Sequence, residues 1–205
     1  MNGKVQIESL GSLVLKDNPL GDPRLREVPV YLPPSYGSRR GKRYPVIFYL
    51  TGFTGTGRMM LNVNPWKENL VERFDRLIAS GAARECVLVM PDCFTAYGGS
   101  QYLNSSATGR YEDHVVCELT AFVRDKFYVS QGPEGTAVMG KSSGGYGALM
   151  LAMKHPAVFG HAASHSGDMF FEASYAAEIP KFAALIDKYG SSRRLTRDFL
   201  QSRRK

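Results

Sequence analysis

The sequence has no long apolar run, no signal-like start and no cysteine pattern typical of a scaffold. No stretch approaches the roughly 20 apolar residues of a membrane helix, and residues 1–15 lack a signal peptide's basic start, apolar run and cleavage site. The chain has three cysteines, Cys86, Cys93 and Cys117. Their odd number argues against a disulfide scaffold, and their spacing is not that of a metal site. We therefore expect a cytoplasmic protein with reduced thiols, no metal and no membrane partner.

The net charge is unevenly spread along the chain. It is +7 in total, yet residues 187–205 alone hold seven basic and two acidic side chains, which leaves about +2 for residues 1–186. A basic terminal segment is more often solvated surface than a nucleic-acid site. We therefore expect no nucleic-acid partner.

Length and composition narrow the class of protein. The 205 residues are 43% hydrophobic and 22% charged, which is typical of a globular protein and excludes disorder and fibres. A single domain of this size can bury a full core. We therefore expect one domain over residues 1–205.

Hydrophobic periodicity predicts alternating strands and helices. Short β-favouring runs indicate six strands, at residues 5–10, 28–32, 46–51, 86–90, 136–139 and 159–164. Helical patterns follow at residues 64–80, 113–127, 143–155, 173–189 and 195–202. In the first helix, Asn64 is the expected cap, Trp66 lies on the apolar face and Gly81 ends the helix. The alternation predicts an α/β fold whose mostly parallel sheet has helices on both faces.

Residues 135–150 fit two motifs with different chemistry. One is the phosphate-binding loop G-x-x-x-x-G-K-S, which would start at Gly135 and bring Lys141 to a nucleotide. That loop needs a buried strand before its first glycine, whereas residues 129–134 resemble a turn and residues 136–139 the strand. Nucleotide binding is therefore a remote alternative, which tight magnesium-dependent ATP binding would support and its absence would eliminate.

The other motif is G-x-S-x-G at residues 140–144, in the strand–turn–helix setting of a nucleophile elbow. Gly140 and Gly144 allow the backbone to fold tightly around Ser142, the candidate nucleophile, whose proton a histidine would take. The start of the following helix favours developing negative charge, so the Ser143 N–H becomes one oxyanion donor. The alternative is a glycine-rich turn that merely contains serines.

A second glycine-rich segment, residues 52–57, follows the predicted strand at 46–51. In this class of fold, the loop after the third strand supplies the other oxyanion N–H, for which Phe53 is our candidate. The alternative is a mobile loop without catalytic duty. Several aromatic residues either border the site, where they suit an apolar or aryl acyl group, or belong to the core: Phe53, Phe94, Tyr97, Tyr102, Tyr111, Phe170 and Phe171.

Five segments together resemble the putative esterase family of α/β-hydrolases: residues 30–36 (VYLPPSY), 44–52 (YPVIFYLTG), 90–93 (MPDC), 140–148 (GKSSGGYGA) and 165–172 (HSGDMFFE). That family includes esterase D (an S-formylglutathione hydrolase), enterochelin esterases, feruloyl esterases and mycolyltransferases. The resemblance covers essentially the whole chain. It implies an α/β-hydrolase fold and hydrolysis of carboxylic esters or thioesters through an acyl-Ser142 intermediate. It also implies Phe53 and Ser143 amides as oxyanion donors and no metal or organic cofactor.

The family's acid and histidine follow the serine, at the ends of a seventh and an eighth strand. Only six strands are predicted here, so we expect the chain to lack the last strands and to stop before that acid and base. Within the chain, His165 is the candidate base because it follows the sixth strand at the sheet edge that holds Ser142, with Asp168 three residues on. The other interpretation of His165 is a structural or pocket-lining role.

Missing strands would have two consequences. A hydrolase-fold protein without its acid and base would be catalytically impaired, and would only bind a ligand or partner; this is the alternative to an active esterase. An unpaired sixth strand would expose a sheet edge, which favours pairing with another copy of the chain. We therefore expect a homo-oligomer whose other partner is a small ester or thioester.

Overall fold

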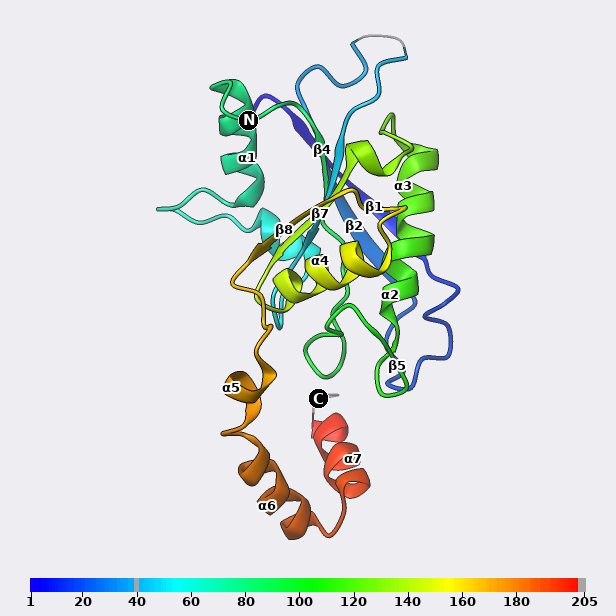
Figure 1. Cartoon of the computed structure of the whole chain (residues 1–205), viewed down its shortest axis with the longest axis vertical. Helices are drawn as coiled ribbons and strands as arrows, with labels where there is room; N and C mark the ends of the chain where they lie inside the picture. The colour runs from blue at the N-terminus through cyan, green and yellow to red at the C-terminus, as the bar shows by residue number, and fades with distance from the viewer. Residues whose placement is uncertain (39–40, 203–205) are drawn as a thin grey trace. The chain divides into compact units, whose positions relative to one another are not determined.

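The computed structural model describes residues 1–38 and 41–202 (Figure 1). It divides into two compact units, Met1–Gly167 and Asp168–Lys205. The first unit contains the sheet with the helices that pack on it, and the described part of the second is helical. The expectation of one domain over residues 1–205 stays a prediction.

A six-stranded sheet forms the centre of the first unit, in the order β1-β2-β4-β3-β7-β8. Its strands are β1 (Lys4–Gly11), β2 (Leu25–Leu32), β3 (Val46–Leu50), β4 (Val87–Val89), β7 (Thr136–Lys141) and β8 (His161–His165). β3 pairs in parallel with β4 and β7, and β7 with β8, whereas β2 is antiparallel to β1 and β4. The six predicted strands are all present, and the predicted α/β fold is confirmed.

Helices cover both faces of this sheet (Figure 1). Helix α1 (Leu70–Ala79) packs on one face, and α3 (Thr120–Lys126) and α4 (Ser143–Lys154) pack on the other. The remaining elements of the first unit are the 3₁₀ turns Gly57–Leu61 and Pro133–Gly135, the short hairpin of β5 (Asn104–Ser105) and β6 (Gly109–Arg110), α2 (Tyr111–Asp113) and a π-helical turn, His114–Leu119.

The second unit contains three helices within its described residues, α5 (Phe171–Tyr175), α6 (Ile179–Tyr189) and α7 (Ser192–Ser202). Gly190 follows α6 in the left-handed conformation, with a φ of 76°, and this ends the helix. No described helix is both long enough and apolar enough to cross a membrane.

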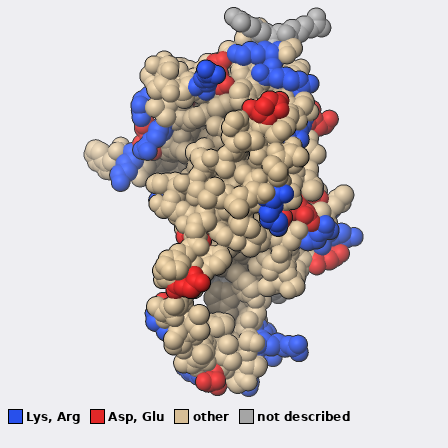
Figure 2. All heavy atoms as spheres, viewed as in Figure 1, with Lys and Arg blue, Asp and Glu red and all other residues tan. Residues whose placement is uncertain are grey.

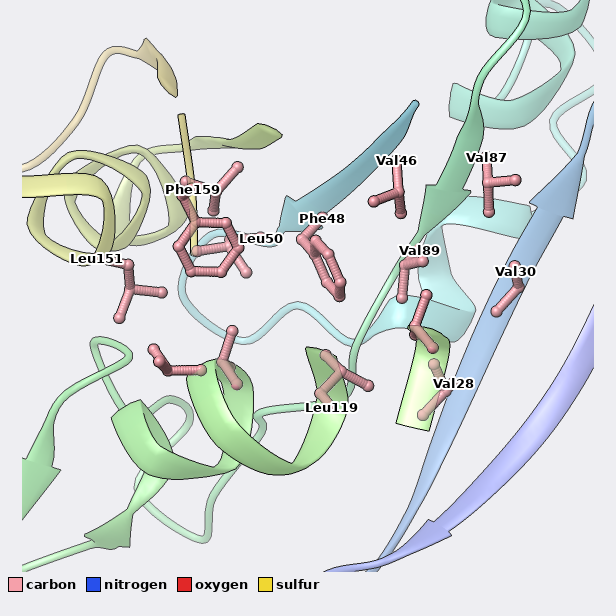
Figure 3. Packing of buried hydrophobic residues seen from close by; sticks show 14 of the residues in the cluster. Val28, Val30, Val46, Phe48, Leu50, Val87, Val89, Leu119, Leu151 and Phe159 are labelled. Atoms are coloured by element: carbon pink, nitrogen blue, oxygen red, sulfur yellow. The ribbon is translucent and has the colours of Figure 1, made fainter. Parts of the chain in front are cut away.

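Alternating side chains of the central strands build one core on each face of the sheet. Val30 and Val89 enter the larger core, beneath α3 and α4, which also contains Leu119 (Figure 3). Their neighbours Tyr31 and Leu88 point to the opposite face and pack with α1. Each fully buried aliphatic side chain contributes about 1.5–3 kcal/mol to folding, so both faces fix the register of the strands.

The predicted start of the first helix was wrong. The helix begins at Leu70 because Asn69 caps it, with the Asn69 side chain accepting from the Glu72 N–H and the Glu72 carboxylate accepting from the Asn69 N–H. Trp66, expected on the apolar face, precedes the helix and is 90% exposed. The predicted end is right, since Gly81 follows the helix with a φ of 74°.

The outer strand β8 differs from its neighbour in burial. All five residues of β8 are exposed, whereas β7 alternates buried and half-buried residues over most of its length.

The cysteines are free thiols, with Cys86 and Cys93 buried and Cys117 exposed. Basic and acidic side chains lie interspersed on the face of the molecule in Figure 2.

Candidate active site

The chain leaves two neighbouring parallel strands at the same edge of the sheet. Leu50, the last residue of β3, lies beside Gly140 of β7 in the parallel register. β4 lies on one side of β3 and β7 on the other. In open α/β sheets, ligands bind outside the carboxyl ends of the strands at such a reversal of strand order. The segments that follow β3 and β7 are therefore the candidate site.

Ser142 sits at the turn between β7 and α4, as the sequence motif predicted. Its φ of 57° and ψ of −123° are unfavourable for a residue with a side chain. The turn is held on both sides: the Ser142 N–H donates to the carbonyl of His165 at 3.0 Å, and the Tyr146 N–H donates to the Ser142 carbonyl at 3.0 Å. The serine thus occupies the N-cap position of α4, where the helix dipole favours negative charge.

Close backbone contacts explain the two glycines of the motif. A Cβ on Gly144 would lie 2.0 Å from the Leu50 carbonyl oxygen, and a Cβ on Gly140 would lie 2.4 Å from the Gly144 carbonyl oxygen. No side chain fits at either position. These glycines bring the start of α4 directly against the end of β3.

The segment after β3 reaches Ser142 through Gly52. A Cβ built on Gly52 would lie 4.0 Å from Ser142 Oγ and 3.3 Å from the Lys141 carbonyl oxygen, so the Gly52 backbone packs against the serine. Phe53 follows with a side chain that is 64% exposed, and Ser143, on the other side of the serine, is buried. The structure thus brings the two residues predicted as oxyanion donors to the neighbourhood of Ser142.

His165 meets Ser142 through its backbone. It ends β8 opposite Lys141 in the parallel register, and its carbonyl accepts the Ser142 N–H. Its side chain is exposed, and its role as a base stays a prediction. Asp168, the residue named with it, begins the second unit.

The other three histidines have partners of their own. His114 is fully buried and its Nδ1 lies 3.0 Å from Glu118 Oε2, while His155 Nε2 lies 2.8 Å from Glu112 Oε1. Burial lowers the pKa of His114, which keeps this ring neutral at physiological pH. His161 Nε2 lies 3.1 Å from the Glu134 carbonyl oxygen. These contacts give each of the three rings a structural partner.

The alternative phosphate-binding motif does not form a loop. The residues between Gly135 and Gly140 belong to β7, which pairs with β3 and β8. Their N–H groups therefore lie in a sheet and cannot wrap a phosphate. Within the described residues, no group of three or more His, Cys, Asp or Glu side chains is placed to hold a metal ion.

From its sequence position, Tyr102 is predicted either to border the site or to belong to the core. The structure buries it against the site: its hydroxyl donates to the Thr51 carbonyl at 2.7 Å, one residue before Gly52. No prediction included Gly98, whose carbonyl accepts the Thr54 N–H at 2.7 Å. The only signal in the sequence was the cluster of glycine and tyrosine at residues 97–102, which does not reveal its partner.

Comparisons with known proteins agree with this geometry. The model of the family described as "Putative esterase" matches residues 23–189. An esterase of Mycobacterium tuberculosis is 30% identical over 141 residues, covering 68% of this chain and 28% of that protein. Bovine S-formylglutathione hydrolase is 30% identical over 135 residues, covering 62% of this chain and 46% of the relative.

A solved structure of a ferulic acid esterase superposes with a TM-score of 0.59 at 27% identity, covering 77% of this chain and 56% of that one. The chain thus spans less than two thirds of the length of each of these three relatives. The family match covers most of the chain, and the superposition agrees with the sheet and helices described above. The chain therefore belongs to the putative esterase family and has the α/β-hydrolase fold.

Proposed function

We propose that this chain hydrolyses carboxylic esters or thioesters through an acyl-Ser142 intermediate. The proposal rests on the strained turn at Ser142, between β7 and α4, where the Gly52 backbone packs against the serine. A strained residue at a functional site costs stability, which the surrounding close contacts must supply. We propose that two backbone N–H groups beside this serine donate to the carbonyl oxygen of a bound ester or thioester.

The proposed reaction has two acyl-transfer steps. Ser142 Oγ attacks the carbonyl carbon and loses its proton to a base, and the Phe53 and Ser143 N–H groups donate to the resulting oxyanion. Collapse of this intermediate expels the alcohol or thiol, which takes the proton from the base. Water then attacks the acyl-serine with help from the same base, which releases the acid and restores the Ser142 hydroxyl. We propose His165 as this base, supported by its position at the end of β8 beside Ser142.

The substrate is proposed from the chemistry of the relatives. The names of two of them specify a thioester, S-formylglutathione, and an ester of an aromatic acid, ferulic acid. We therefore propose a small ester or thioester as the partner of this site. Proton transfer and charge stabilisation are both assigned to protein groups, so the proposed mechanism needs no metal or organic cofactor. A cytoplasmic location stays a prediction.

The test is steady-state hydrolysis of p-nitrophenyl acetate by the parent chain and by Ser142→Ala. Loss of the hydroxyl should lower kcat by about a thousandfold or more, because no other group can form the acyl-enzyme. Ser80→Ala, at the exposed end of α1, is the matched control and should keep the parent rate. Equal rates for the parent and Ser142→Ala would contradict the proposal and favour the alternative of a catalytically impaired, binding-only protein.

A matched pair of histidine variants tests the base. His165→Ala should lower kcat strongly, whereas His161→Ala, at the other end of β8, should leave it near the parent value. Losing a general base typically costs about a hundredfold to ten-thousandfold. An unchanged rate in His165→Ala would assign the base elsewhere and leave a structural role for His165.

We also propose that the chain self-associates through β8. This strand is one of the two outer strands of the described sheet, and all five of its residues are exposed. An outer strand presents unpaired N–H and carbonyl groups along its free edge, and a second copy can satisfy them.

A further inference from the structure

We propose that Gly98 and Tyr102 are positioning residues that hold the Phe53 N–H in its donor geometry; this inference rests on the proposed function. They lie in one short stretch, residues 98–102, that we call the bracing segment. It contacts the chain on both sides of the peptide group that carries the Phe53 N–H.

The first contact comes from Tyr102. Its side chain is 4% exposed, and its hydroxyl donates to the carbonyl of Thr51 at 2.7 Å. Burial raises the pKa of Tyr102 far above the physiological range, so the hydroxyl keeps its proton and remains a donor. This bond fixes the peptide group between Thr51 and Gly52, which is one peptide before the donor.

The second contact comes from Gly98. Its carbonyl accepts the Thr54 N–H at 2.7 Å, which fixes the peptide group between Phe53 and Thr54. The peptide between Gly52 and Phe53 is therefore held at both ends by the bracing segment. Its own carbonyl accepts the Gly55 N–H at 3.0 Å. Because the peptide is trans, the Phe53 N–H points away from that carbonyl.

Close packing makes these contacts stiff. A Cβ on Gly98 would lie 2.8 Å from the Phe53 ring, and Gly98 has a φ of 93° that favours glycine. A Cβ on Gly147, in α4, would lie 2.5 Å from the Tyr102 ring. The bracing segment thus touches both the segment that carries the Phe53 N–H and the helix that begins with Ser143. One element sets the separation of the two proposed donors.

Unfavourable backbone conformations gather at the same place. Gln101 and Tyr102 are consecutive residues with positive φ, at 52° and 57°, and Thr54 has a φ of 63°. Such conformations persist where the surrounding structure over-determines them, and they cluster at active sites. The bracing segment thus shares the unfavourable backbone conformations of the turn at Ser142, in keeping with a positioning role.

The experiment measures kcat and KM for p-nitrophenyl acetate in Tyr102→Phe and Gly98→Ala. Phenylalanine removes only the hydroxyl that fixes Thr51, and alanine displaces the Phe53 ring and the Gly98 carbonyl. Small misplacements of a catalytic group are costly, so kcat should fall about tenfold in each variant, with KM within about twofold of the parent. Rates are referred to the concentration of serine that reacts with a fluorophosphonate, so partial unfolding does not count as lost kcat.

Two control variants separate positioning from general packing. Tyr31→Phe removes another buried tyrosine hydroxyl, one that donates to Asp75 at 2.9 Å on the α1 face. Gly81→Ala replaces another glycine with a positive φ, at the open end of α1. Both variants should keep the parent kcat, even if they lower the melting temperature.

Each outcome decides the inference. A kcat loss confined to Tyr102→Phe and Gly98→Ala supports it. Parent kcat in Tyr102→Phe, or an equal loss in Tyr31→Phe, overturns it; if Gly98→Ala does not fold, the two tyrosine variants decide alone. Equal hydrolysis by the parent and Ser142→Ala would instead overturn the proposed function, and this inference with it.

Discussion

At the scale of single residues, Asp75 shows how the first unit secures its N-terminal residues. This carboxylate in α1 is 5% exposed and accepts the N–H groups of Asn2 and Gly3 at 2.8 and 2.6 Å and the Tyr31 hydroxyl at 2.9 Å. Burial alone would raise the pKa of Asp75, but these donors favour the charged form and lower it. The ionised carboxylate therefore links three parts of the fold.

We expect Asp75→Asn to lower the free energy of unfolding by about 1–3 kcal/mol at pH 7, because buried donors lose a charged acceptor. The pKa of the Asp75 carboxyl is lower in the folded state than in the unfolded state, where it is about 3.9. Such a carboxyl stabilises the fold at pH values above about 3.9, and this stabilisation is lost as the pH falls through the folded-state pKa. The difference between parent and variant should therefore shrink from pH 7 to pH 3. Urea denaturation at both pH values measures it, and a difference independent of pH would contradict the explanation.

The residues of the candidate site differ in how far they could be predicted. Ser142 and its glycines follow from a local motif, because strand, turn and helix are contiguous in the sequence. Tyr102 acts on Thr51, which is 51 residues away in the chain, so no local pattern connects them. The partners of such a residue become visible only when the fold brings distant segments together.

At the scale of elements, the two ends of α1 were predicted with unequal success. The strands were found because short β-favouring runs identify them directly, and Gly81 correctly marked the end of the helix. The start was missed because Asn64 followed by proline resembles a cap, while the reciprocal bonds of Asn69 and Glu72 decide the true start. The spacing of asparagine and glutamate, three residues apart, was the available signal.

A matched pair of variants tests this boundary. Asn69→Ala should destabilise the protein by about 1 kcal/mol, the usual cost of a lost N-cap. Asn64→Ala removes only an exposed bond to the Trp66 N–H, and should change stability by no more than about 0.5 kcal/mol. Urea denaturation of both variants compares them, and equal effects would show that the cap at Asn69 does not set the start of α1.

At the scale of the whole molecule, the proposed self-association depends on the exposed strand β8. Six strands were predicted from the sequence, and the sixth of them, β8, is one of the two outer strands of the described sheet. The division into two compact units was not predicted, since the helical patterns after residue 168 do not show whether they pack on the sheet.

We expect light scattering after size-exclusion chromatography to show a dimer or larger species whose share rises with concentration. Mass action makes the proposed self-association through the exposed edge of β8 depend on concentration. A monodisperse monomer at every concentration, with a cooperative melt, would contradict self-association through β8.

Covalent labelling tests whether Ser142 is the nucleophile. A fluorophosphonate transfers its phosphonyl group to an activated serine oxygen and releases fluoride. We predict one adduct per chain, located by peptide mass spectrometry on Ser142 and absent from Ser142→Ala. An adduct that persists in Ser142→Ala, or a parent chain that takes up no label, would contradict the claim.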